Sequence, residues 1–169
     1  MILSRTSIIK EIENGNLKFD PRIKNDQVGP SSIDLRLGNT FIHLDKELQE
    51  EQSVGADVRW YIQEQPWRPF VDKYGRQEVI VDNSAIELRP FKFVLGFTLE
   101  YIQLPPWLAG TVEGKSGHAR RGLLVHMTAP TVQAGWHRQL QLEFCNLGPA
   151  TLLLKTKTSD LPTHLGAGY

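Results

Sequence analysis

The sequence predicts a mainly β fold, of the sandwich or barrel type, that begins with one short helix. Short apolar or alternating runs recur along the chain with Asn, Asp, Gly and Pro between them, which is typical of antiparallel strands joined by turns. Apolar residues at helical spacing occur near the N-terminus. The chain has 169 residues, 40% of them hydrophobic, which is enough for one domain with a real core.

The elements follow in order. Ser4 can cap a helix whose isoleucines recur at helical spacing, and Gly15 is placed to end it. Leu17–Pro21 reads as a short strand, and Ser31–Gly38 alternates strictly, with apolar residues on one face and polar residues on the other. Further strands are predicted at Thr40–Leu44, Glu78–Val81, Ala85–Leu88, Phe93–Phe97, Leu99–Gln103, Gly110–Val112, Leu123–Met127, Thr131–Val132, Leu140–Cys145 and Thr151–Leu154.

Two segments break the pattern. Residues 45–77 mix charges, glutamines and prolines with aromatic residues, and we interpret them as an irregular excursion with some strand content at Val58–Ile62 and no chemistry. Lys155–Tyr169 has no periodicity, and we expect a loose or separately docked tail. The predicted organisation is therefore a single β domain, residues 1–154, and a tail, residues 155–169.

Composition excludes several classes of protein. Lys+Arg and Asp+Glu both number 19, so no overall field draws in nucleic acid or an anionic membrane, and neither is expected as a partner. A single cysteine, Cys145, excludes an intrachain disulfide framework and the multi-cysteine zinc sites of familiar nucleobase deaminases. The chain contains no apolar run of membrane-spanning length and no signal-peptide pattern, so we expect a cytoplasmic enzyme.

A basic loop is the first candidate site. Lys115–Gly122 combines one hydroxyl, small residues and cations, which suits a phosphate bound by backbone N–H groups and the Ser116 hydroxyl and neutralised by Arg and Lys. The order of a Walker A loop is absent. A solvated basic turn is an equally good interpretation of this composition.

Glu143 is the second candidate. In the predicted strand Leu140–Cys145, the side chains of Leu140, Leu142 and Phe144 share one face, and Glu143 lies on the other. A carboxylate among apolar neighbours suits proton transfer in a cleft, whereas the alternative is an exposed Glu on a half-buried sheet. Asp34 and Arg36, two residues apart on one strand face, are expected to pair with each other or across chains.

Together these residues resemble the dCTP deaminase branch of the dUTPase-like superfamily. Gly114–Leu123 resembles the pattern G-[RK]-S-S-x-A-R-x-G-L, and Ser31–Gly38 resembles a second family motif with S-x-D-x-R-L-G. Thr128-Ala129, Gly135-Trp136 and Leu142-Glu143 follow at the family's spacing. The resemblance extends through most of the chain to about Leu154.

The resemblance implies a homotrimeric β-clip or distorted barrel with active sites between subunits. It implies zinc-independent deamination of dCTP to dUTP and ammonia, which feeds dUMP and dTTP synthesis, with Mg²⁺ bound to the triphosphate. Glu143 would move the protons, Ser116 and the Ala129 carbonyl would hold the water, and Arg120 would order the site. The substrate-binding residues implied are Lys115, Ser116, Gly117, Arg120, Thr131, Val132, Gln133 and Trp136.

Three departures from the family pattern keep alternatives open. Gln133 replaces an Asp that activates water in dUTPases, which argues against a dUTP diphosphatase or a bifunctional enzyme. Gly117 replaces a second Ser and removes one phosphate donor, and the tail after Lys155 does not match the family's closing segment. A dUTP diphosphatase and a non-catalytic nucleotide-binding trimer therefore remain alternatives, and the resemblance leaves dTTP open as an inhibitor.

Overall fold

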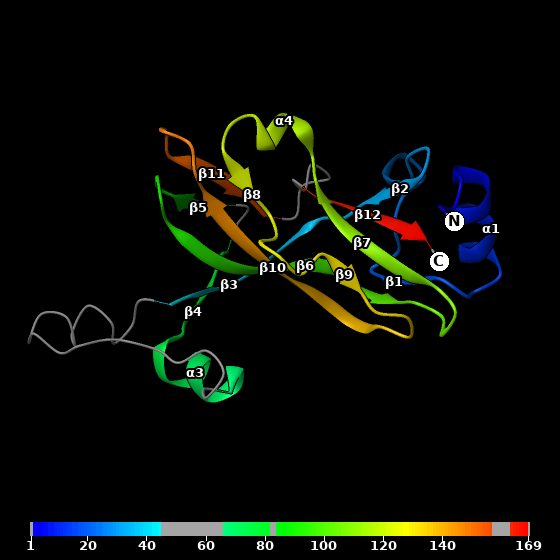
Figure 1. Cartoon of the computed structure of the whole chain (residues 1–169), viewed down its shortest axis with the longest axis horizontal. Helices are drawn as coiled ribbons and strands as arrows, with labels where there is room; N and C mark the ends of the chain where they lie inside the picture. Colours follow the sequence, from blue (N-terminus) through cyan, green and yellow to red (C-terminus); the bar gives the residue numbers. More distant parts are fainter. Residues whose placement is uncertain (1, 45–65, 82–83, 157–162, 169) are drawn as a thin grey trace, which may run out of the picture.

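The computed structural model describes residues 2–44, 66–81, 84–156 and 163–168 and shows a mainly β chain (Figure 1). The predicted strand content at Val58–Ile62 lies outside the described residues. The elements are α1 (Arg5–Glu13), β1 (Lys18–Asp20), the 3₁₀ turn η1 (Asn25–Gln27), β2 (Ser32–Asp34), β3 (Leu37–His43), α3 (Trp67–Tyr74), β4 (Arg76–Val79), β5 (Ala85–Leu88), β6 (Phe93–Gln103), β7 (Ala109–Gly114), α4 (Ser116–Ala119), β8 (Leu123–Leu124), β9 (Thr131–Val132), β10 (His137–Asn146), β11 (Leu152–Lys155) and β12 (Thr163–Gly168).

The strands of the described residues form three antiparallel groups. The largest has the order β4-β3-β6-β10-β8, with β1 also paired to β6. A four-stranded group has the order β2-β12-β7-β9, and β11 pairs with β5. Figure 1 shows α3 and α4 on opposite sides of the molecule, α4 between β7 and β8 and α3 next to β4. The predicted mainly β fold with a short N-terminal helix is confirmed.

The N-terminal helix forms for the reasons that its sequence suggests. The Ser4 hydroxyl accepts a hydrogen bond from the Ser7 N–H, which satisfies one of the unpaired donors of the first turn. Ile8 is fully buried, and Gly15 ends the helix at a φ of 72°, a backbone conformation that favours glycine. The helix thus packs one apolar stripe on the β core.

The ladder between β6 and β10 forms the centre of the large sheet. Glu143 lies opposite Leu95, and Leu142 lies opposite Gly96. A side chain at position 96 would come within 2.7 Å of the Phe144 ring, so glycine lets the two strands pack tightly there. The predicted faces are confirmed: the even-numbered residues Leu140, Leu142 and Phe144 are buried, and Glu143 points to the other face.

A buried ion pair corrects one prediction. Arg36 does not pair with Asp34; its Nε donates to the Glu100 carboxylate at 2.7 Å, and its backbone N–H donates to the same group at 2.8 Å. The Glu100 side chain is fully buried, and its nearness to Arg36 could not be read from local spacing, because the two are 64 residues apart. Asp34 pairs instead with Lys115, at 2.5 Å.

Two irregular segments have more structure than the sequence suggests. Within residues 45–77 the structure places the helix α3 and the start of β4. Near the C-terminus, the backbone of β12 pairs with β2 on one side and with β7 on the other, so residues 163–168 are not loose. The division of the chain at residue 154 remains a prediction.

We expect Glu100→Ala to destabilise the fold by about 3 to 5 kcal/mol, because it leaves the Arg36 guanidinium half-buried without its counter-charge. Chemical denaturation at a fixed protein concentration measures the effect. Glu87→Ala, which removes an exposed carboxylate from β5, serves as the control and should change stability by less than about 0.5 kcal/mol. Equal unfolding midpoints for the two variants would contradict the stabilising role of the buried pair.

Candidate active site

The basic loop joins the end of β7 to α4. Lys115 precedes the short helix, and its Nζ is held by the Asp34 carboxylate of β2. Ser116 and Arg120 are exposed, and the Gly117 carbonyl accepts a hydrogen bond from Arg121 at 2.8 Å. The loop therefore presents a hydroxyl and a guanidinium to solvent, while the Asp34 carboxylate fixes the ammonium of Lys115.

A tight turn ends the basic loop. Gly122 has a φ of 90°, and its carbonyl accepts a hydrogen bond from the Leu147 N–H at 2.8 Å. A side-chain carbon at this position would lie 2.2 Å from the backbone nitrogen of Gly148. The turn thus ties the loop to the end of β10, and only glycine satisfies both its backbone conformation and this close approach.

The predicted sugar- and base-flanking residues form a second unit, β9 and the turn after it. Thr131 and Gln133 are exposed, whereas Val132 is buried. The Trp136 N–H donates to the Gln133 carbonyl at 3.1 Å, and the indole N–H donates to the Arg138 carbonyl at 2.9 Å. The Arg138 guanidinium lies over the indole, 5.2 Å from its centre, which fixes the ring in place.

Glu143 is held at one of its two oxygens. Its Oε2 accepts a hydrogen bond from the Met127 backbone N–H at 2.8 Å, and its own N–H donates to the Val125 carbonyl at 3.1 Å. Within the part of the chain that the structure describes, no group donates to Oε1. The side chain is half-buried, so the carboxylate is fixed in direction and keeps one oxygen available for a water or a ligand.

Glu143 lines a pocket of about 450 Å³. The volume lies within the range of small-molecule sites. Among the described residues its walls are largely apolar, and Gln141, Thr128 and Glu143 supply the polar side chains. The described residues that line the pocket are Leu44, Trp67, Phe93, Leu95, Met127, Thr128, Gln141 and Glu143.

The predicted site residues do not all meet within one chain. Thr128, next to Ala129, lies in the Glu143 pocket, but Ser116 and Arg120 are not among the described residues that line it. The β9 unit pairs with the start of β7 at Gly110, and the basic loop follows the other end at Gly114, roughly 13 Å away at about 3.3 Å per residue. The chain thus carries three partial sites: the basic loop, the β9 turn and the Glu143 pocket.

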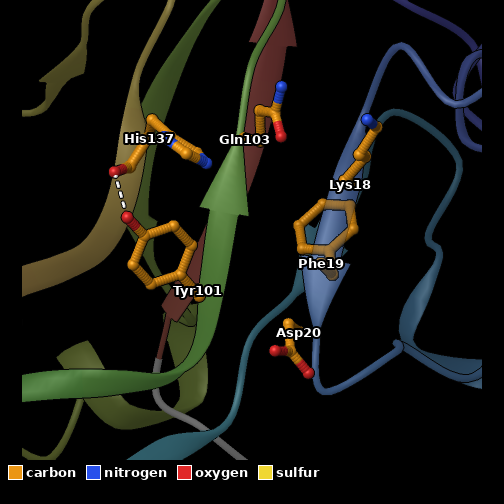
Figure 2. A pocket seen from close by; sticks show the side chains of 6 residues that line it. All are labelled: Lys18, Phe19, Asp20, Tyr101, Gln103 and His137. Carbon is orange, nitrogen blue, oxygen red and sulfur yellow. Dashed lines mark hydrogen bonds between the residues drawn. The ribbon is translucent and has the colours of Figure 1, made fainter.

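A second hollow has a different lining (Figure 2). It measures about 540 Å³, and none of the predicted catalytic or binding residues belongs to its described lining. The Tyr101 hydroxyl donates to the His137 carbonyl at 2.6 Å, and the two rings meet edge to face. The lining is Lys18, Phe19 and Asp20 from β1, Tyr101 and Gln103 from β6, and His137 from β10.

The described part of the chain shows neither a cluster of metal ligands nor a membrane-spanning helix. Its His, Cys, Asp and Glu residues form no group of three or more that could hold a metal ion. Among its helices, none combines the length and the apolar character needed to cross a bilayer.

A fixed, half-buried carboxylate in a pocket of this size defines a class of protein: a β domain that binds a small molecule and can move a proton within the site. The basic loop adds the groups that a phosphate requires. Comparison with known proteins then identifies the family.

A family model described as dCTP deaminase-like matches residues 2–159. The dCTP deaminase of Actinobacillus succinogenes is 35% identical over 158 residues, which cover 92% of this chain and 77% of that protein. The dCTP deaminase of Rhodospirillum rubrum is 34% identical over 164 residues, which cover 92% of this chain and 76% of that protein. The chain belongs to the dCTP deaminase-like family.

A solved structure shares the fold. The 2′-deoxycytidine 5′-triphosphate deaminase of Agrobacterium tumefaciens matches with a TM-score of 0.68 and 20% sequence identity over 98% of this chain. This chain spans 46% of the length of that solved chain. At this identity the match concerns the fold, and it agrees with the mainly β architecture described above.

Two glycines with positive φ allow a matched test of the loop geometry. We expect Gly135→Ala to cost about 1 to 2 kcal/mol, because it adds only backbone strain in open space. Gly122→Ala should cost about 3 to 5 kcal/mol, because it adds the same strain and a clash with Gly148. Free energies of unfolding from chemical denaturation compare the two variants, and an equal loss would contradict the close approach of the loop to β10.

Proposed function

We propose that this chain hydrolyses dCTP to dUTP and ammonia. The observation that carries the proposal is Glu143, a carboxylate fixed by the Met127 N–H in a pocket large enough for a nucleobase. Its free oxygen gives the site a positioned proton acceptor. The family assignment and the two deaminase relatives support the choice of dCTP as the substrate.

The proposed reaction uses Glu143 as a proton carrier. Oε1 takes a proton from a water molecule while the water oxygen attacks C4 of the cytosine, and the proton passes to N3. The carboxylate then moves the second proton from the new hydroxyl to the amino group, and the C4–N bond breaks to release ammonia. The Ser116 hydroxyl and the Ala129 carbonyl orient the water, and Arg120 orders the site.

The triphosphate is assigned to the basic loop. Lys115 and Arg120 supply positive charge, and the Ser116 hydroxyl and the Gly117 backbone donate hydrogen bonds. Mg²⁺ enters as part of the substrate, chelated by the phosphates. Thr131, Val132, Gln133 and Trp136 flank the sugar and the base, and dTTP, which carries the same triphosphate, is a candidate inhibitor of this site.

We further propose that the site is completed by a second copy of the chain in a homotrimer. Ser116 and Arg120 are exposed, and the described lining of the Glu143 pocket includes neither of them. A closed symmetric assembly can bring the basic loop of one copy to the Glu143 pocket of another.

Gln133 separates this function from the diphosphatase alternative. A neutral amide cannot take a proton from water, so this position lacks the base that attack on a phosphorus atom would need. Its exposed side chain in the turn after β9 leaves it able to contact a sugar hydroxyl. The non-catalytic alternative is not favoured either, because Glu143 is held in a geometry that suits catalysis.

Glu143→Gln should lower the rate of ammonia release from MgdCTP by about 10²- to 10⁴-fold, because the amide keeps the shape of the side chain but cannot accept a proton and pass it on. Ammonia, dUTP and pyrophosphate are measured in one reaction. Glu87→Gln, which lies outside the pocket, is the control and should keep the wild-type rate. A fully active Glu143→Gln, or release of pyrophosphate by the wild type, would contradict the proposed reaction.

Mixing two inactive variants tests the assembly. Ser116→Ala and Glu143→Gln are refolded together at equal concentration, and native mass checks that trimers form. If each site takes Ser116 from one copy and Glu143 from another, about a quarter of the sites contain both wild-type residues, and about a quarter of the wild-type activity returns. If each site is built within one chain, no activity returns in the mixture. A stable monomer would also contradict the proposed trimer.

A further inference from the structure

Trp67 brings an indole from α3 to the pocket that holds Glu143. The other described lining residues are supplied by the large sheet, by Leu44 after β3 and by Met127-Thr128. Leu95 lies directly opposite Glu143 in the ladder, so it forms the floor beside the carboxylate. Trp67 therefore adds an aromatic wall to a pocket whose floor is an apolar strand face.

A row of aromatic side chains holds this indole in place. Trp67, Phe70 and Tyr74 follow one face of α3, and the Trp67 and Phe70 rings stack at 5.8 Å between centres with 23° between their planes. The Phe70 and Tyr74 rings are 5.1 Å apart, and Tyr74 is buried. The row runs from a buried anchor to the pocket, so the orientation of the Trp67 ring is fixed before a ligand binds.

Packing in the hydrophobic core does not explain why the Trp67 side chain is half exposed. Its side chain is 49% exposed, although a tryptophan that serves only packing is usually much more buried. One part of the indole stacks on Phe70, and another lines the Glu143 pocket. The free surface is therefore presented where a ligand would lie.

The pocket combines a flat aromatic surface with polar groups on one strand. Gln141 and Glu143 lie two residues apart on the same face of β10, and both line the pocket with Trp67. An amide and a carboxylate can bond to the edge of a heteroaromatic ring while an indole stacks on its face. This chemistry selects a nucleobase over an aliphatic or purely anionic ligand.

We propose that Trp67 stacks on the cytosine ring of the bound nucleotide and thereby contributes to recognition of the base. This inference rests on the proposed function of the same pocket. It assigns a binding role to a helix in the segment whose sequence has the least regular pattern. The phosphates, held by the basic loop, do not depend on Trp67.

Equilibrium binding tests the proposal independently of turnover. Calorimetry in a Glu143→Gln background gives the Kd of MgdCTP and of magnesium tripolyphosphate, which has no base. Trp67→Ala should weaken dCTP binding about tenfold and leave tripolyphosphate binding within about twofold, since stacking acts on the base alone. Trp67→Phe should keep dCTP binding within about threefold of the parent, because it retains an aromatic face.

Trp107→Ala is the matched control. It removes another half-exposed tryptophan, 44% exposed, that lies outside the described lining of the pocket, and it should leave both Kd values unchanged. Tryptophan fluorescence provides a readout should Trp67→Ala fail to fold. Binding of dCTP should quench the emission of the parent and of Trp107→Phe strongly and that of Trp67→Phe markedly less, because only Trp136 then remains beside the nucleotide.

The outcomes separate this inference from the proposed reaction. Unchanged dCTP binding in Trp67→Ala, or equal weakening of dCTP and tripolyphosphate, would overturn the stacking role while deamination by the wild type still stands. Quenching as strong in Trp67→Phe as in the parent would overturn it as well. Trp67-dependent dCTP binding without ammonia release would overturn only the reaction, and absence of dCTP binding by the wild type would overturn both.

Discussion

The pairing between β6 and β10 determines where the chemistry of this chain lies. β6 also pairs with β1 and β3, so it is the strand around which the large sheet is organised. Its register with β10 shifts between Gln139 and Gln141, where residues 98–100 of β6 lie opposite Leu140. The Leu140 N–H bonds to the buried Thr98 hydroxyl at 3.0 Å, which satisfies the backbone donor that the irregularity leaves unpaired. Because Gln141, Glu143 and Cys145 then follow in regular alternation, the carboxylate is held on the pocket face of the sheet.

The same irregularity accommodates a buried charge. Glu100 lies within the shifted part of β6, and its carboxylate is bonded by Arg36 and at 3.4 Å by the Gln27 amide. Several donors bond to the Glu100 carboxylate, and together they offset the free energy that is lost when its charge is removed from water. This arrangement also ties the segment between β2 and β3 to the central strand. Asp34, two residues before Arg36, holds Lys115, so this buried network and the basic loop are connected through one short stretch of chain.

Local patterns predicted much of this structure, and long-range contacts account for what they missed. The alternation of Ser31–Gly38 and Leu140–Cys145 identified the buried faces, because side chains in a strand alternate whatever the topology. The partners of Arg36 and Asp34 could not be found in this way, since both contacts join residues more than 60 positions apart. Trp67 was missed for a related reason: α3 has aromatic residues on one face but is short and follows an irregular segment. The strand β12 lacks an apolar alternation and is recognisable only from its backbone pairing.

The central claim is that the base of the nucleotide occupies the Glu143 pocket and that another copy of the chain completes the site. A crystal structure of Glu143→Gln with MgdCTP tests it most directly. The cytosine edge that carries the amino group should face residue 143, with Ser116 of a neighbouring copy beside the attacking water. A base bound outside this pocket, in the hollow near Tyr101 for example, or a site whose Ser116 and residue 143 come from the same chain, would contradict it.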